Sequence, residues 1–301
     1  MDPSQSQTKT FQQHVLVMRH GDRLDHADPT WEKTADRPWD SPLTQRGLSR
    51  AFQTGRAFRT LLPFPIHRVF VSPLLRCVQT ASEVVTALCA VDDDPNANSS
   101  SDVVSIDSSR VKVSIEYGLC RLLNTSAVRL DVVPKDGIFR FDIPKIESSL
   151  PSGTLDRTVE PIYKEVPQWE ETSQGTRSRH EQIFKALADK YPSENLLLVT
   201  HCKLNSWILD SDKNMLMMLL LCCFIDLNNW LYTFRMQGKG VADSVSAFKE
   251  DTRVTKIYYC GYSELRRSVS WKNQTFTTGN FEMLTKSGLT GITYENRNFV
   301  D

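Results

Sequence analysis

The sequence predicts an α/β fold, a three-layer sandwich in which helices cover both faces of a mainly parallel sheet. The first observation behind this prediction is that short apolar runs, typical of buried strands, alternate with segments of about 15 residues whose apolar side chains recur at helical spacing. The second is that two of the expected strands end in a histidine, His20 and His201. In such folds ligands bind outside the carboxyl ends of the strands.

The first strand is expected at residues 15–18, where an apolar run precedes the polar turn Arg19-His20-Gly21-Asp22. The polar residues 1–13 before it are expected to form a disordered tail. Thr44 can cap a helix that Pro63 ends. The same patterns predict strands at 68–71, 111–115, 196–199 and 254–260, and helices over 74–88 and 180–191.

Residues 131–175 contain five prolines and little periodicity. A long loop of this kind inside a compact domain usually has a function, so we expect a lid over the site. A chain of 301 residues is long for one domain and short for two. We therefore expect a single domain over residues 14–301.

The composition excludes several classes of function. Basic and acidic residues number 36 each, so no global field favours a nucleic acid or an anionic membrane as a partner. The longest apolar run, residues 215–225, is shorter than the roughly 20 residues that span a bilayer. The seven cysteines are scattered without a CxxC pair, so we expect no zinc cage and a reducing, cytoplasmic compartment. The sequence has no ligand cluster with metal spacing and no nucleotide-binding motif, so we expect no metal and no other cofactor.

Three candidate residues fall at one edge of the predicted sheet: His20 after the first strand, Arg76 just past the second and His201 after the fourth. A phosphoryl transfer needs cations around the phosphate oxygens, a nucleophile in line and an acid for the leaving group. Neutral imidazole can act as that nucleophile, and arginine binds phosphate bidentately. Each residue alone is a weak signal, because a lone histidine after a strand is more often structural. Together they indicate phosphate chemistry.

Four motifs carry a resemblance to a known family. They are the turn RHG at 19–21, PLTQRG at 42–47, SPLLRCVQTA at 72–81 and VTH at 199–201. With them the sequence resembles the histidine phosphatase superfamily, which has a phosphoglycerate-mutase-like fold. The resemblance covers roughly residues 14–201 and resumes near residue 238.

The resemblance implies a role for each candidate residue. His20 is expected to be the nucleophile that forms a phosphohistidine. Arg19 and Arg76 are expected to bind the phosphate, and His201 to contact the same phosphate. The Asp22-Arg23 pair after the turn is similar to the branch of the ubiquitin-associated SH3-domain phosphatases and their plant and fungal single-domain relatives, in which Arg23 adds a further cation.

The sequence departs from this branch at the general acid. A glutamate follows the segment 115–120 in the related proteins, and the aligned residue here is Arg121. A guanidinium does not donate a proton at neutral pH because its pKa is above about 12. Glu116 is the tentative substitute acid, with a surface carboxylate at the strand end as the alternative interpretation. Asp22 and Asp25 are the other carboxylates within reach.

A second departure follows His201. Relatives continue from this histidine into a Gly-x-Gly-Val turn, which here begins at Gly238, so residues 202–237 form an atypical insert. One interpretation is an added helix near the mouth of the pocket or a partner surface. The other is translated intron from an imperfect gene model.

The function predicted first is that of a phosphomonoester hydrolase acting through a phosphohistidine on His20. Its substrate would be a phosphorylated small molecule or a phosphoprotein, and the sequence selects neither the substrate nor an oligomeric state. The alternative is a catalytically weak or inactive phosphate-binding module used for ligand or partner recognition, which Arg121 and the insert favour. A phosphoglycerate-type mutase is the third possibility, and Asp22-Arg23 argues against it.

Overall fold

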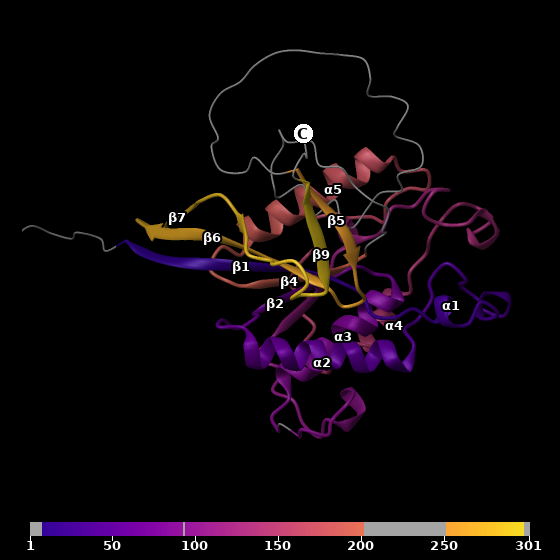
Figure 1. The fold of residues 1–301 in the computed structure, drawn as a ribbon, viewed down its shortest axis with the longest axis horizontal. Helices are drawn as coiled ribbons and strands as arrows, with labels where there is room; N and C mark the ends of the chain where they lie inside the picture. Colours follow the sequence, from indigo (N-terminus) through magenta and orange to yellow (C-terminus); the bar gives the residue numbers. More distant parts are fainter. Residues whose placement is uncertain (1–7, 93, 202–250, 298–301) are drawn as a thin grey trace, which may run out of the picture.

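The computed structural model describes residues 8–92, 94–201 and 251–297. The insert 202–237 and the turn that begins at Gly238 lie outside the described residues. Within the described ranges, the main sheet has seven strands in the order β3-β2-β4-β1-β6-β7, with β8 paired to β6 (Figure 1). Its strands are β1 (Lys9–Arg19), β2 (Arg68–Val71), β3 (Lys112–Ile115), β4 (Leu196–Thr200), β6 (Tyr262–Lys272), β7 (Thr275–Thr278) and β8 (Glu282–Met283).

The part of the sheet from β3 to β1 is parallel, as predicted, and the part beyond β1 is antiparallel. Strands β1, β2, β3 and β4 pair in parallel. Strand β6 runs antiparallel to β1, β7 and β8. A separate antiparallel pair is formed by β5 (Asp251–Ile257) and β9 (Ile292–Arg297). The strand expected at 254–260 is therefore present in part, but it lies outside the main sheet.

Helices cover both faces of the sheet (Figure 1). One face carries α2 (Gln45–Leu61) and α3 (Leu75–Cys89), and the opposite face carries α5 (Ser173–Lys190). The short helices α1 (Leu24–Ala27) and α4 (Ile143–Ser148) and four 3₁₀ turns lie in the connections. The predicted three-layer α/β sandwich is confirmed.

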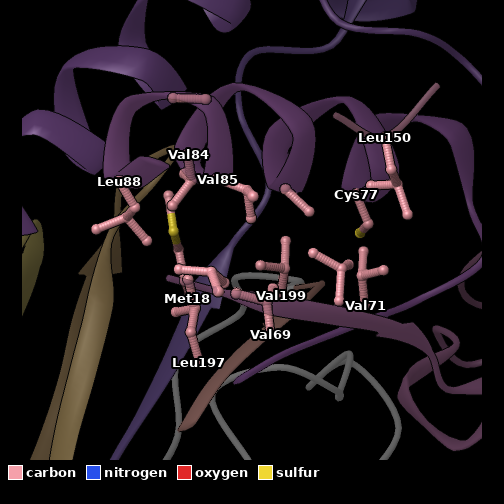
Figure 2. Close-up of a cluster of buried hydrophobic side chains, with 14 of the residues drawn as sticks. Met18, Val69, Val71, Cys77, Val84, Val85, Leu88, Leu150, Leu197 and Val199 are labelled. Carbon is pink, nitrogen blue, oxygen red and sulfur yellow. The ribbon is translucent and has the colours of Figure 1, made fainter. Parts of the chain in front are cut away.

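The apolar runs of the central strands, residues 15–18 of β1, 69–71 of β2 and 196–199 of β4, have no polar position because both of their faces are buried. Leu16 and Met18 of β1 pack with α2 and α3, whereas Val15 and Val17 pack with α5. Figure 2 shows Val84 of α3 facing Met18 and the side chains of β2 and β4. This packing fixes the carboxyl ends of β1, β2 and β4 side by side, where the candidate residues follow.

The prediction of a disordered tail over residues 1–13 was wrong for residues 9–13. Strand β1 begins at Lys9, so residues 9–13 are not part of a disordered tail. They pair with β6, from Lys9 opposite Trp271 to Gln13 opposite Arg267. The prediction failed because these residues are polar and their partner strand lies about 250 residues away, beyond the reach of local pattern arguments.

Residues 131–175 do not form the expected lid. Leu155 bridges to Val113 of β3, so the segment extends the edge of the main sheet. Ile146 of α4 and the nearby Leu150 pack into the core beside α3. In the described part of the chain, Val132 is the one residue of this segment that lines the cavity described below. No helix within the described ranges is long and apolar enough to cross a bilayer.

Candidate active site

A cavity of about 470 Å³ lies at the carboxyl ends of β1 and β4. His20, Arg76 and His201 all line it, as the sequence predicted, although they are far apart in the chain. Arg19, Arg23 and three further groups of side chains complete the lining. These groups are the cations Arg121 and Arg129, the titratable residues Asp25, His26 and Glu32, and the apolar residues Pro38, Trp39, Leu122, Ala127, Val128 and Val132.

His20 is held as a neutral imidazole with one defined tautomer. Its ring is buried, and Nδ1 lies 2.8 Å from the carbonyl oxygen of Gly21. A carbonyl only accepts, so Nδ1 carries the hydrogen and Nε2 keeps its lone pair. Burial, followed by the charges of Arg76 and Arg19, lowers the pKa of His20 well below its usual value. No described residue bonds to Nε2, which leaves it available as a nucleophile.

The backbone around His20 is fixed from three sides. The His20 amide donates to the carbonyl of Thr200 at 3.1 Å, and its own carbonyl accepts from Cys260 at 3.2 Å. The Gly21 amide donates to Thr80 Oγ1 at 2.9 Å, and that hydroxyl donates to the Arg76 carbonyl. Thr80 therefore ties the turn that carries the nucleophile to the helix that carries Arg76.

Glycine is required at one position of this turn, Gly21, and at one position in the first turn of α2, Gly47. A Cβ on Gly21 would lie 2.8 Å from the Gly47 carbonyl oxygen, and a Cβ on Gly47 would lie 2.5 Å from that of Asp22. The turn and the start of α2 thus pack backbone against backbone. This close approach is the physical reason for glycine in both the RHG and PLTQRG motifs.

Arg76 is a buried cation with donors that lack partners. Its Nη2 lies 3.2 Å from His201 Nδ1, and no described residue accepts from Nε or Nη1. Burial, followed by repulsion from Arg23, lowers the pKa of Arg76 to about 10. Unpaired buried donors are costly, so the site favours an anion that accepts from them.

His201 supports Arg76 in this geometry. Because a guanidinium only donates, His201 Nδ1 accepts and Nε2 carries the hydrogen, which it donates to Ser72 Oγ at 2.8 Å. Burial and the charge of Arg76 lower the pKa of His201. Its ring centroid lies 5.4 Å from that of His20. Both ring nitrogens are thus engaged, and His201 orients Arg76 beside the nucleophile.

The other predicted cations differ in how far their charge is compensated. Arg19 stacks over Tyr259 at 4.1 Å and donates to the Ile257 carbonyl, but its Nε has no described partner. Arg23 is neutralised by Asp25, through Nε at 2.9 Å and through Nη2. Arg19 therefore offers an uncompensated charge to a phosphate, and Arg23 does not.

Glu116 lies outside the cavity, and it is not a surface carboxylate either. It is 1% exposed and does not line the cavity. Its two oxygens accept from the backbone amides of Gly118 at 2.9 Å, Ile162 at 2.7 Å and Tyr163 at 3.0 Å. Burial raises the pKa of Glu116, and these amides counteract the shift. The prediction failed because two of the three partners belong to a distant segment of the chain.

The other two candidate carboxylates are also unavailable for proton donation. Asp22 points toward α2, where it pairs with Arg50 at 2.7 Å, and it does not line the cavity. Asp25 does line it. Burial alone would raise the pKa of Asp25, but the charge and hydrogen bonds of Arg23 lower it overall. Asp25 is therefore ionised at neutral pH.

Sequence reasoning missed several residues of the site. Glu32 and Arg129 form an ion pair at the cavity wall, and His26 Nδ1 lies 2.7 Å from the hydroxyl of Tyr259. All four lie in short turns and connections without a motif, so no local signal could have found them. Among the residues that the structure describes, no group of three or more potential ligand side chains could hold a metal ion.

Comparisons with known proteins agree with this geometry. Residues 15–96, which contain β1, α2, β2 and α3, match the family model described as the histidine phosphatase superfamily (branch 1). No curated protein matches the chain significantly. Residues 15–96 thus carry the sequence pattern of this superfamily. Both His20 and Arg76 lie within this segment.

Solved structures align with most of the chain. The ecdysone phosphate phosphatase of Bombix mori, in complex with tungstate, is 19% identical and covers 89% of this chain and 92% of its own, with a TM-score of 0.52. A phosphoglycerate mutase from Bacillus anthracis str. Sterne aligns at 14% identity over 90% of this chain and 93% of its own, with a TM-score of 0.40. The likeness to the ecdysone phosphate phosphatase shows that the two chains share a fold.

Proposed function

We propose that this protein is a phosphomonoester hydrolase that acts through a phosphohistidine on His20. One observation carries the proposal: a neutral, buried imidazole whose Nδ1 is held by Gly21 lines a cavity in which Arg19, Arg76 and Arg121 have no carboxylate partner among the described residues. Such a pocket attracts a dianionic phosphate and holds a nucleophile beside it.

Each residue then has a definite task. Arg76 and Arg19 donate to the phosphate oxygens and stabilise the charge that spreads over them in the transition state. Gly21 accepts from His20 Nδ1 and so directs the Nε2 lone pair toward phosphorus. His201 orients Arg76, and Arg23 contributes mainly by holding Asp25.

The comparisons support the class of reaction. The similar structures include a phosphatase of ecdysone phosphate with tungstate bound, and a phosphoserine phosphatase from Entamoeba histolytica. Tungstate is an oxyanion, and we propose that oxyanions bind this chain between Arg76 and His20. A phosphorylated small molecule is the substrate class we place first, and a phosphoprotein the second.

The test is hydrolysis of para-nitrophenyl phosphate by the wild type, by His20→Ala and by the control His14→Gln. His14 pairs with Glu264 at 2.8 Å and does not line the cavity. We expect turnover by the wild type and the control, and none by His20→Ala. A phosphoenzyme trapped from the wild type should carry acid-labile, alkali-stable phosphate. Wild-type turnover no higher than that of His20→Ala would refute the proposal.

A second candidate function is a phosphate-binding module with little turnover. It is favoured by one observation: both carboxylates among the described lining residues are paired with arginine, so neither is free to donate a proton. Phosphate or vanadate that raises the Tm of a wild type without turnover would support this alternative, because a ligand that binds only the folded state stabilises it.

We also propose that the protein resides in the cytoplasm. The cysteines that the structure describes, Cys77, Cys89, Cys120 and Cys260, are all buried and unpaired. Unpaired thiols suit a reducing compartment. Fractionation of cells with an antibody against the chain tests this, and recovery in the secreted fraction would contradict it.

A further inference from the structure

The cavity is larger than a phosphate needs, and its lining contains two kinds of residue. Arg19, Arg76 and His20 are polar, whereas Trp39, Leu122, Val128 and Val132 form an apolar wall. Cavities of this size commonly enclose most of a small organic ligand. The wall is therefore available to the part of a substrate that lies beyond its phosphate.

The apolar wall is rigid because a small core stands behind it. The ring of Trp39 packs edge-on against Phe139 and Phe141, with centroids 4.9 Å and 5.3 Å away. Val128 belongs to the same buried cluster, and Val132 packs against it. A flat apolar group that enters the cavity would meet a preformed surface, which reduces the entropy lost on binding.

Arg121 is a second cation at this wall, and it differs from Arg129, which is paired with Glu32. It precedes Leu122, and its Nη2 is fixed by the carbonyl of Ala127. No described carboxylate pairs with it. Burial, followed by repulsion from Arg76 and Arg23, lowers the pKa of Arg121 to about 9, so it remains charged at neutral pH. The guanidinium is thus an uncompensated positive charge, near enough to the phosphate-binding cations to repel them.

The described lining offers no proton donor near this wall. The carboxylates of Asp25 and Glu32 are held by Arg23 and Arg129. Burial and the charge of Arg23 lower the pKa of His26, which leaves it neutral at pH 7. A leaving group that must be protonated would therefore depart slowly, whereas one that is stable as an anion would not.

We infer that Arg121 and the apolar wall form a leaving-group subsite for phosphate monoesters of phenols. In this subsite the guanidinium stabilises the departing phenolate oxygen by charge alone, without transferring a proton, while the wall packs against the aromatic ring. The inference rests on the proposed function and names its substrate class and a further catalytic residue.

The steps balance without an external acid. The Nε2 lone pair of His20 forms the N–P bond as the P–O bond to the phenol breaks, and the bonding pair leaves with the phenolate oxygen. Arg121 stabilises that oxygen, which takes a proton from solvent after release. Water then attacks phosphorus, the N–P bond breaks, and both hydrogens of the water leave with dihydrogen phosphate. Neutral His20 is restored.

The experiment measures kcat/KM for para-nitrophenyl, phenyl and benzyl phosphate. This constant reports steps up to cleavage of the P–O bond. Phenyl and benzyl phosphate are similar in size, but benzyl alcohol is a far weaker acid than phenol. With no acid to assist, we expect wild-type kcat/KM to fall from para-nitrophenyl to benzyl phosphate by on the order of 10²–10⁴-fold or more.

Two variants at Arg121 test the residue itself. Arg121→Gln removes the charge, and we expect kcat/KM for the aryl phosphates to fall by about 10²-fold, which is the usual loss for one transition-state donor. Arg121→Glu introduces a carboxyl group that can donate a proton, so the ratio of benzyl to para-nitrophenyl phosphate activity should rise. Arg140→Gln, which alters an exposed arginine paired with Asp136, is the matched control.

Several outcomes would overturn the inference. One is wild-type kcat/KM values for benzyl and para-nitrophenyl phosphate within tenfold of each other, a result that needs no variant to fold. Another is unchanged leaving-group dependence and activity in a folded Arg121→Gln. A steeper dependence in His26→Asn would assign proton donation to His26 instead. If no substrate shows turnover that depends on His20, the proposed function itself fails; turnover that depends on His20 but not on the leaving group refutes only the subsite.

Discussion

Replacement of Glu116 separates a structural carboxylate from a catalytic one. In Glu116→Gln the side chain keeps its size and one carbonyl oxygen. Its new NH₂ group, however, faces a backbone N–H that donated a hydrogen bond to the carboxylate, so two donors now oppose each other. At least one of the three bonds to Gly118, Ile162 and Tyr163 is lost. In Glu116→Ala all three amides lose their acceptor while they remain buried.

The expected size of the effect follows from these bonds. A hydrogen bond to a charged group contributes about 1.5–3 kcal/mol, so Glu116→Gln should lower the free energy of unfolding by about that amount. For a chain of this size that corresponds to a drop in Tm of roughly 2–5 °C. Glu116→Ala should lose about 3–5 kcal/mol, because bonds that share one carboxylate are not additive.

Two measurements on the same preparations decide the matter. Thermal unfolding gives the Tm, and hydrolysis of para-nitrophenyl phosphate well below the Tm gives kcat/KM. We expect Glu116→Gln to lose stability and to keep kcat/KM within about tenfold, whereas loss of a general acid costs about 10²–10⁴-fold. Glu165→Gln is the control, since Glu165 is exposed. A Glu116→Gln protein with unchanged Tm and a hundredfold lower kcat/KM would show that the structural role is wrong.

Four further predictions concern stability and the gene. Arg179→Met should lower the free energy of unfolding in urea by about 3–5 kcal/mol, because Glu171 and the carbonyls of Gly118 and Cys120 lose the buried cation that they bind. The control Arg157→Met removes an exposed cation and should lower it by less than about 1 kcal/mol. Gly55→Ala places a Cβ 2.6 Å from the Val84 carbonyl and should cost about 1–3 kcal/mol by the same assay, so an unchanged midpoint would contradict the close packing of α2 on α3. Burial lowers the pKa of three histidines: His20, His180 and His201. Below pH 6.5 each of them takes up a proton only in the unfolded state, so the free energy of unfolding should fall by about 3.5 kcal/mol per pH unit between pH 6 and 5.5, and a flat profile would refute this. Sequencing the transcript across residues 195–245 should show the codon of His201 joined directly to that of Gly238 if residues 202–237 are intron, and an uninterrupted insert would favour the added helix.

The parts of the fold that could be predicted are those set by local patterns. The apolar runs of β1, β2 and β4 have no polar position because both faces are buried. The ends of these runs in turn place His20 and His201 at the carboxyl edge of the sheet. Strand β6 was missed because its alternation is interrupted by a buried Arg267, which pairs with Asp189 and Gln13 from elsewhere in the chain. Such a charge is compatible with a strand only in the presence of those distant partners.

The candidate site divides in the same way. His20, Arg19, Arg76 and His201 lie in motifs whose spacing already indicates that they meet. The role of Glu116 depends on backbone amides 46 and 47 residues away, which no pattern around it reveals. The pairing of Glu32 with Arg129 joins two irregular loops, and the orientation of His201 depends on the Ser72 hydroxyl. These features follow from tertiary contacts rather than from periodicity.

Strand β1 is synthesised first and paired late. Its two neighbours in the sheet, β4 and β6, begin at Leu196 and Tyr262, so the ribosome adds about 180 residues before the first of them exists. At about 5–20 residues per second that interval lasts roughly 10–35 s. During it the apolar side chains of residues 15–18 and two unpaired strand edges are open to other nascent chains, which is the exposure that leads to aggregation. The yield of folded protein in a cell should therefore depend on chaperones that hold emerging strands, and on how fast the segment between β1 and β4 is translated.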